Sequence, residues 1–146
     1  MHKDGAALAD YDRTVERLLE RDEDLAELLG AVDAARAGKG ALVLVGGEAG
    51  IGKTSLLRAL RAELGGGTAF LVGACEPLSV PAPLQPIREL ARAAGAPDLA
   101  ALDGDDRLVL ARELLDVLGV HAPTVAVVED AHWADPATLD VLRLLA

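Results

Sequence analysis

Cysteine, aromatic residues and long apolar runs are scarce in this chain of 146 residues. Cys75 is the only cysteine, which excludes an intrachain disulfide and favours a reducing, intracellular setting. The only aromatic residues are Tyr11, Phe70 and Trp133, so the core must consist of Leu, Val and Ala, as in helices packed on a parallel sheet. No apolar run approaches the ~20 residues that span a bilayer, and the N-terminal residues lack the apolar segment of a signal peptide. We therefore expect a cytoplasmic protein without a membrane segment.

Basic residues are also few, with 14 Lys and Arg against 24 Asp and Glu, which gives a net charge of −10. A surface this negative repels a phosphate backbone at long range, so direct nucleic-acid binding by this chain is not expected. The charge does not exclude a local phosphate site, because backbone N–H groups and a single lysine act at short range.

The hydrophobic pattern predicts one α/β domain with a parallel sheet, because stretches of strand type alternate with stretches of helical spacing. Since the length is that of one ordinary domain, we assign residues 1–14 to a flexible leader and 15–146 to the domain. Strands are expected at 41–45, 68–72 and 124–128. Helices, covering both faces of the sheet, are expected at about 22–37, 53–64, 84–94, 105–118 and after Asp135-Pro136.

Local signals predict where several of these elements begin and end. We expect Asp22 to cap the first helix and Gly38 to end it. Asp135, followed by Pro136, has the sequence of a cap and first position for the last helix. Residues 76–86 hold four of the seven prolines, which predicts an irregular connection.

A glycine-rich segment directly follows the first expected strand. It reads Gly47-Glu-Ala-Gly-Ile-Gly-Lys-Thr54 and matches the pattern G-x-x-x-x-G-K-[ST]. Glycines let the backbone curl around an anion so that N–H groups point inward, and the N-terminus of the following helix adds positive potential. Lys53 can reach the β- and γ-phosphates, and the Thr54 hydroxyl can ligate Mg²⁺. The segment therefore predicts binding of ATP with Mg²⁺, and its expected nucleotide contacts are Gly47, Glu48, Ala49, Gly50, Ile51, Gly52, Lys53, Thr54 and Ser55.

Two acidic residues, Glu129 and Asp130, follow the apolar run Val125-Ala-Val-Val128. An acid at the end of such a strand can hold Mg²⁺, and a neighbouring acid can orient the attacking water. Position assigns Glu129 to the metal and Asp130 to the water. The opposite division stays open, because the matching motif of proteins with such a glycine-rich loop more usually has the order Asp-Asp or Asp-Glu. The expected catalytic residues are thus Lys53, Glu129 and Asp130, and the expected metal ligands are Thr54 and Glu129.

Other residues near these acids are expected to have structural roles. His132 has the character of a solvated or helix-capping group, and Trp133 that of a packing anchor. We interpret Asp135 as a helix cap rather than a catalytic acid, and Cys75 as a small apolar filler.

Three segments carry a resemblance to a known family: Leu18-Leu-Glu-Arg-Asp-Glu-Asp-Leu25, Val43-Leu-Val-Gly-Gly-Glu-Ala-Gly-Ile-Gly-Lys-Thr-Ser-Leu-Leu57 and Val128-Glu-Asp-Ala-His-Trp-Ala-Asp135. They resemble the ATPase module of the large LuxR-type transcriptional regulators, an AAA-like module of the STAND class. The resemblance covers about residues 15–146 and implies a P-loop NTPase fold. It also implies that residues 19–21 lie over the adenine, which makes Arg21 an expected nucleotide contact. Bound ATP would act as a conformational switch that slow hydrolysis resets.

The resemblance further implies a larger protein around this module. In such regulators a helical sensor region and a C-terminal helix-turn-helix follow, and neither is in this sequence. The implied strand order puts a fourth strand between the first and the third, whereas this chain is expected to stop after the third strand and the next helix. We therefore expect a truncated N-terminal part of a regulator, with poor ATPase activity by itself.

Two other interpretations remain beside the nucleotide switch. The chain could belong to a P-loop enzyme, such as a motor-type ATPase or a small-molecule kinase. A kinase needs an acceptor-binding lid rich in Arg, and residues 76–120 offer only a few arginines spread over helices. Alternatively, the chain is a non-functional fragment that binds nothing tightly because its sheet is incomplete.

Overall fold

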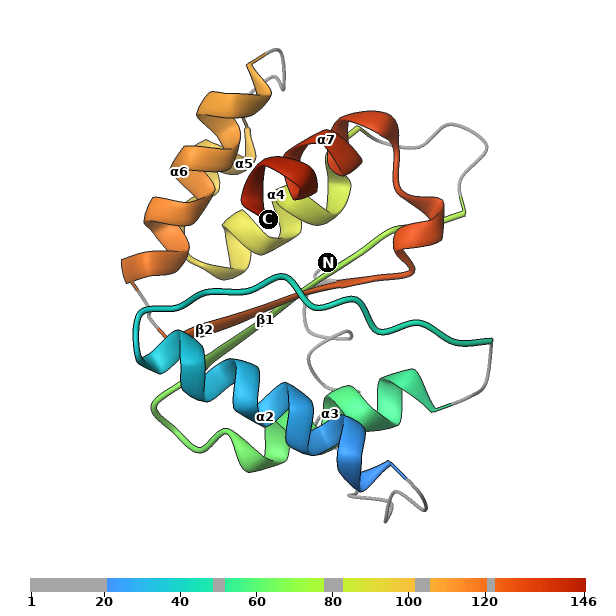
Figure 1. The fold of residues 1–146 in the computed structure, drawn as a ribbon. Coiled ribbons are helices and arrows are strands. Elements are labelled where there is room, and N and C mark those ends of the chain that lie inside the picture. Colours follow the sequence, from blue (N-terminus) through green and yellow to red (C-terminus); the bar gives the residue numbers. More distant parts are fainter. Residues whose placement is uncertain (1–20, 49–51, 78–82, 102–105, 121–122) are drawn as a thin grey trace, which may run out of the picture. The chain divides into compact units, whose positions relative to one another are not determined.

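The computed structural model describes residues 21–48, 52–77, 83–101, 106–120 and 123–146 (Figure 1). The expected leader lies outside these residues. The architecture is α/β, and the chain divides into two compact units, Met1–Thr68 and Ala69–Ala146. Each unit has helices and buried apolar residues of its own. The assignment of 15–146 to a single domain stays a prediction.

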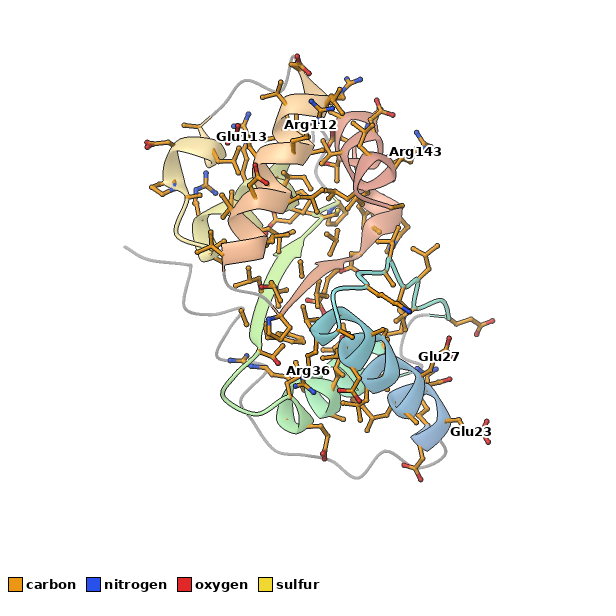
Figure 2. All side chains as sticks on the ribbon, turned by 60° about the vertical axis from the view of Figure 1, so that its left-hand side comes forward. Glu23, Glu27, Arg36, Arg112, Glu113 and Arg143 are labelled. Carbon is orange, nitrogen blue, oxygen red and sulfur yellow. The ribbon has the colours of Figure 1, made fainter. Side chains whose placement is uncertain are left out.

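Two helices pack against each other in the first unit, α2 (Asp22–Arg36) and α3 (Lys53–Glu63) (Figure 1). Arg36, labelled in Figure 2, ties the end of one helix to the end of the other. Its guanidinium donates to the backbone oxygen of Leu64 at 3.2 Å and to Thr68 Oγ1 at 3.0 Å. Apolar residues at helical spacing form the buried faces of the pair, namely Leu28, Val32, Leu56, Ala59, Leu60 and Leu64.

The start of α2 differs from the prediction. Arg21 is the N-cap residue and makes no side-chain cap hydrogen bond, while Asp22 is already the first helical residue. Asp22, Glu23 and Asp24 crowd the first turn, where the positive end of the helix dipole favours their charge. Asp22 therefore stabilises this end by its charge and not as a cap. Gly38, with φ of 82°, follows the end of the helix as expected.

The strand expected at 41–45 is not formed. Residues 41–48 contain no helix or strand, and Leu42, Val43 and Leu44 are 50%, 41% and 86% exposed. A strand must pair its backbone N–H and C=O groups with a neighbour. The described part of the first unit contains no second strand that could be this neighbour. The prediction was wrong because an apolar run indicates a preference for burial in a sheet but not the presence of a partner.

The second unit contains a parallel sheet of two strands, β1 (Ala69–Ala74) and β2 (Thr124–Glu129), which lie side by side in Figure 1. The register pairs Ala69 with Thr124 and Ala74 with Glu129. Both strands were predicted from their apolar runs, and each extends one or two residues further than expected. Their parallel direction confirms the α/β class, in which helices connect consecutive strands.

Helices α4 (Gln85–Ala93), α5 (Pro97–Ala100) and α6 (Arg107–Val120) connect the two strands. The short helix η1 (Ala131–Trp133) and α7 (Pro136–Leu145) follow β2. In Figure 1, α4, α6 and α7 lie on the same side of the strands. Their core is aliphatic, as the scarcity of aromatic residues predicted, and consists of Leu84, Ile87, Leu90, Ala91, Leu99, Leu110, Ala111, Leu114 and Val141.

Two proline-rich connections are more helical than predicted. The irregular segment was expected to run from 76 to 86, but α4 begins at Gln85 with Pro86 in its first turn. Helix α5 was not predicted, and it likewise begins at a proline, Pro97. A first-turn N–H has no partner within a helix, so proline is tolerated there and starts the helix rather than preventing it.

Helix α4 approaches β1 closely at Gly73. A Cβ built on Gly73 would meet the carbonyl group of Pro86, so only glycine leaves room for this contact. One residue further, the N–H of Ala74 donates to Glu89 Oε2 at 2.8 Å, and Glu89 Oε1 accepts from Gln85 Nε2 at 3.3 Å. Glu89 thus satisfies a backbone donor at the carboxyl end of β1 and holds α4 to that end.

Candidate nucleotide-binding site

The glycine-rich segment belongs to the first unit and leads directly into α3. Gly47 and Gly52 have φ angles of 145° and 88°, values that glycine adopts more readily than other residues. Gly52 is also the N-cap residue of α3, so the chain turns into the helix at a left-handed glycine. Residues 49–51, which are Ala49, Gly50 and Ile51, lie outside the described residues.

Lys53 is the first residue of α3, and its side chain reaches back to the start of the glycine-rich segment. The ammonium nitrogen donates to the carbonyl oxygen of Gly47 at 2.7 Å and to that of Glu48 at 2.9 Å. These hydrogen bonds join the start of α3 to the start of the glycine-rich segment. They also place a positive charge close to the segment's own backbone and to the N-terminal end of α3, where an anion is favoured.

Thr54 and Ser55 occupy the next two positions of α3. The Thr54 side chain is exposed, and its hydroxyl oxygen is the type of hard ligand that Mg²⁺ prefers. Arg21, which was expected near the adenine, is the N-cap residue of α2, and its Nε lies 3.6 Å from Asp24 Oδ2 in an ion pair. Leu19 and Glu20 lie outside the described residues.

Glu129 and Asp130 belong to the second unit, at the carboxyl end of β2. Glu129 is the last strand residue, and its backbone oxygen accepts from the N–H of Cys75 at 3.0 Å. Asp130 has left the strand and adopts a left-handed backbone, with φ of 53° and ψ of 39°. In a continued strand the side chains of Glu129 and Asp130 would point in opposite directions, but this alternation does not extend to Asp130. A non-glycine residue in this region is uncommon, and such residues cluster at functional sites.

Asp130 begins a tight turn that ends at Asp135. The N–H of Trp133 donates to the Asp130 oxygen at 2.8 Å, and the N–H of Ala134 donates to the Ala131 oxygen at 3.1 Å. Trp133 was expected to be a packing anchor, but its side chain lies at the surface, 49% exposed, with its ring centroid 5.0 Å from that of His132. The prediction that Trp133 is a packing anchor was wrong, because Trp133 belongs to η1, a short surface helix none of whose residues is buried.

Asp135 caps α7, which confirms the prediction from sequence. Its Oδ1 accepts from the N–H groups of Ala137 at 3.0 Å and Thr138 at 3.1 Å. Its Oδ2 accepts from the N–H of Leu84 at 3.1 Å and from the Thr138 hydroxyl. Burial disfavours the charged form of Asp135, but these hydrogen bonds outweigh burial and lower the pKa of the carboxyl group below its ordinary value. Asp135 is therefore ionised at neutral pH.

Carboxylates gather around Cys75, at the carboxyl ends of β1 and β2. The Cys75 side chain is buried, as predicted for a small apolar filler. Burial raises the pKa of its thiol, and the charges of Asp135, Asp130 and Glu89 raise it further. No sequence motif singles out Glu89, whose only signal is its helical spacing from Gln85. This carboxyl edge is where parallel α/β proteins bind their ligands.

A family model described as AAA ATPase domain matches residues 17–146, which include both the glycine-rich segment and the strand-end acids. The chain belongs to the AAA ATPase domain family. No curated protein and no solved structure matches it. As an AAA ATPase domain, the chain is a nucleotide-binding module of the P-loop type. The resemblance to an AAA-like module of the P-loop type, inferred from the sequence, is confirmed by this match. The narrower resemblance to LuxR-type regulators stays a prediction.

The expected Mg²⁺ ligands belong to different units, the Thr54 hydroxyl to the first and the Glu129 carboxylate to the second. Each is an oxygen donor, and Mg²⁺ takes hydroxyl and carboxylate oxygens together with phosphate oxygens and water, so each group is chemically suited to the ion. Within the described ranges, no group of three or more His, Cys, Asp and Glu side chains could hold a metal by itself. In the same part of the chain, no helix has the length and hydrophobicity needed to cross a membrane.

Proposed function

We propose that this AAA ATPase domain binds ATP with Mg²⁺ through residues 47–55 and acts as a nucleotide switch that slow hydrolysis resets. The position of Lys53 carries the proposal. Its ammonium group hydrogen-bonds to the carbonyls of Gly47 and Glu48 at the N-terminus of α3, where two sources of positive potential coincide. These are the lysine charge and the first-turn N–H groups, whose partial charges form the positive end of the helix dipole.

The reaction proposed is attack of water on the γ-phosphorus of ATP, which breaks the bond to the β-phosphate oxygen and yields ADP and phosphate. In this reaction Lys53 would bind the phosphates, and Thr54 and Glu129 would hold Mg²⁺, which would supply positive charge to the phosphate oxygens. Asp130 orients the water and accepts its proton. The exposed position of Asp130 just beyond β2 supports this assignment, because the group must reach a bound water.

We propose further that the switch serves a signal-transducing transcriptional regulator of the LuxR type. Two sequence segments support this narrower assignment, because they are more specific than the phosphate loop. They are Glu129-Asp-Ala-His-Trp-Ala-Asp135, after β2, and Arg21-Asp22, at the start of α2. In this proposal Arg21 contacts the nucleotide, and sensor and helix-turn-helix regions receive the change of state. The module itself, with its net charge of −10, does not contact DNA. Such a regulator works in the cytoplasm.

Replacing Lys53 tests the phosphate-binding role. We expect Lys53→Ala to weaken ATP affinity by at least about tenfold, because a charge-assisted contact to phosphate is lost. Titration with a fluorescent ATP analogue in the presence of Mg²⁺ measures the affinity, and circular dichroism checks the fold. Lys39→Ala is the matched control, since Lys39 is an exposed lysine outside the glycine-rich segment. Unchanged affinity in a folded Lys53→Ala protein would remove the basis of the proposal.

An assay of products separates the switch from a small-molecule kinase. The protein is incubated with ATP labelled at the γ-phosphate, with and without a panel of small hydroxyl and amine acceptors. A slow release of labelled phosphate that acceptors do not change supports the switch. Transfer of the label to an acceptor would instead assign the chain to the kinases.

A further inference from the structure

The two oxygens of the Asp135 carboxylate have different partners. Oδ1 accepts from the first-turn N–H groups of Ala137 and Thr138 and so caps α7. Oδ2 accepts from the N–H of Leu84, 51 residues earlier in the chain, at 3.1 Å. One carboxylate therefore joins two connections of the sheet, the one from β1 to α4 and the one from β2 to α7.

Leu84 occupies a backbone conformation that needs such support. It is the N-cap residue of α4, with φ of 61° and ψ of 20°, which is the left-handed region. This region is unfavourable for a bulky side chain, and a residue persists there only when its surroundings hold it. The Leu84 side chain is 1% exposed within the core of the second unit. Its N–H donates to Asp135, and its carbonyl oxygen accepts from the N–H of Arg88 in α4 at 2.9 Å.

The turn between Asp130 and Asp135 has little freedom. Its backbone is closed by the hydrogen bonds from Trp133 to Asp130 and from Ala134 to Ala131. On the strand side, the ladder holds Glu129 in register with Ala74. The position of Asp130 is thus set from one end by β2 and from the other end by the anchored carboxylate of Asp135.

We propose that Asp135 is a positioning residue, whose carboxylate couples the start of α4 to the turn that carries Asp130. When the bond to Leu84 is present, the two connections move as one body and the backbone of Asp130 keeps its left-handed turn. When the bond is broken, the turn is anchored only to α7. The consequence for hydrolysis rests on the proposed function, whereas the coupling itself does not.

The variant Asp135→Asn separates the two roles of this carboxylate. Asparagine is as good a cap as aspartate, and its oxygen can keep the two first-turn donors of α7. Its NH₂ group then faces the N–H of Leu84 and cannot accept from it. Thr138→Val is the matched control, because it removes the other bond to Oδ2 at a fully buried position and leaves the bond to Leu84 in place.

Trp133 reports on the coupling without any nucleotide. It is the only tryptophan of the chain and lies inside the turn, half exposed, so its fluorescence depends on the local conformation. In the full chain without nucleotide, Asp135→Asn is expected to change the emission maximum or the iodide quenching of Trp133. Thr138→Val is expected to leave both unchanged. Wild-type fluorescence and quenching in folded Asp135→Asn would overturn the coupling.

Single-turnover phosphate release at saturating ATP measures the effect on hydrolysis. Asp135→Asn is expected to lower the rate by at least about tenfold while the Kd for ATP changes by less than about twofold, since only the positioning of Asp130 is lost. A parallel loss of affinity would indicate a general structural role and overturn the proposal. If the wild-type chain releases no phosphate, the hydrolysis in the proposed function fails, but the Trp133 comparison still decides the coupling. If Asp135→Asn does not fold, Asp135→Ser, which also keeps a capping oxygen, replaces it in both measurements.

Discussion

Glu129 and Asp130 are adjacent in sequence but differ in backbone conformation. Glu129 completes β2 and is half-buried, whereas Asp130 is exposed and turns out of the strand with a positive φ. The directions of the two side chains are therefore set by the turn and not by strand alternation. This difference supports separate roles for the two acids in the proposed reaction.

Substitution of each acid tests this division. We expect Glu129→Gln to weaken the Mg²⁺ dependence of ATP binding, because a carboxylate ligand is replaced by a neutral amide. Asp130→Asn is expected to leave binding unchanged and to lower phosphate release by about 10²- to 10⁴-fold, the usual contribution of a general base. Titrations at several Mg²⁺ concentrations and single-turnover assays measure the two effects. Asp116→Asn, an exposed acid on α6, is the control. Identical behaviour of the two variants would contradict the division.

Gly73 lies where α4 and β1 leave no room for a side chain. Gly73→Ala would bring a methyl group against the carbonyl of Pro86, so α4 must move away from β1. We expect the free energy of unfolding to fall by about 1–3 kcal/mol, as in other overpacked sites. Gly119→Ala in α6 is the control, and it is expected to raise the free energy of unfolding. Nothing lies within 4 Å of a Cβ built on Gly119, and alanine favours a helix over glycine by about 0.5–1 kcal/mol. Urea unfolding measures both, and equal stability of Gly73→Ala and wild type would show that α4 adapts.

At the scale of elements, the apolar run 41–45 lacks both the strand pairing and the burial that its composition favours. It has the composition of a central strand but no strand pairing, and its side chains are largely exposed. An unpaired apolar strand offers free N–H and C=O groups to other chains and is a site of self-association.

Leu44→Lys is therefore expected to reduce self-association. A charge on an unpaired strand opposes the addition of another strand, and at a side chain that is 86% exposed it should change stability by less than about 0.5 kcal/mol. Light scattering against protein concentration, together with thermal melting, measures the two effects. The control Val120→Lys replaces a similarly exposed residue, 79% against 86%, at the end of α6, where the backbone belongs to a helix. Equal effects of both variants would show that surface hydrophobicity, and not the strand, causes association.

At the scale of the whole molecule, the excess of acidic residues dominates the electrostatics. Glu23 and Glu27 lie along α2, and Glu113 lies on α6 beside Arg112 (Figure 2). The sequence pI is about 4.6, so the chain is strongly negative at neutral pH. The proposed phosphate site would therefore act through local dipoles and Lys53 against a repulsive long-range field.

The negative charge predicts that the chain does not bind duplex DNA by itself. We expect a Kd weaker than about 10⁻⁴ M at physiological salt, which is the weak limit of non-specific binding. Fluorescence anisotropy with a labelled duplex measures the affinity, and a histone-like basic protein serves as the positive control. Tighter binding whose affinity falls as salt rises would reveal a basic surface that the net charge conceals.

The sequence by itself determined the features that depend on neighbouring residues. The glycine-rich segment, Lys53 and the start of α3 are consecutive, so one short motif predicts them together. The cap at Asp135 and the two paired strands follow from local patterns for the same reason. The scarcity of aromatic residues likewise determined an aliphatic core.

Only the tertiary structure decided what depends on residues far apart in sequence. The run 41–45 has no strand pairing because pairing needs a partner and not only hydrophobicity. The left-handed backbone of Asp130 and the exposure of Trp133 follow from the closed turn that leaves β2. The contact of Gly73 with Pro86 and the bond from Leu84 to Asp135 arise when α4 and α7 pack in the second unit. No local pattern predicts them, because each contact joins separate elements whose positions are set by packing.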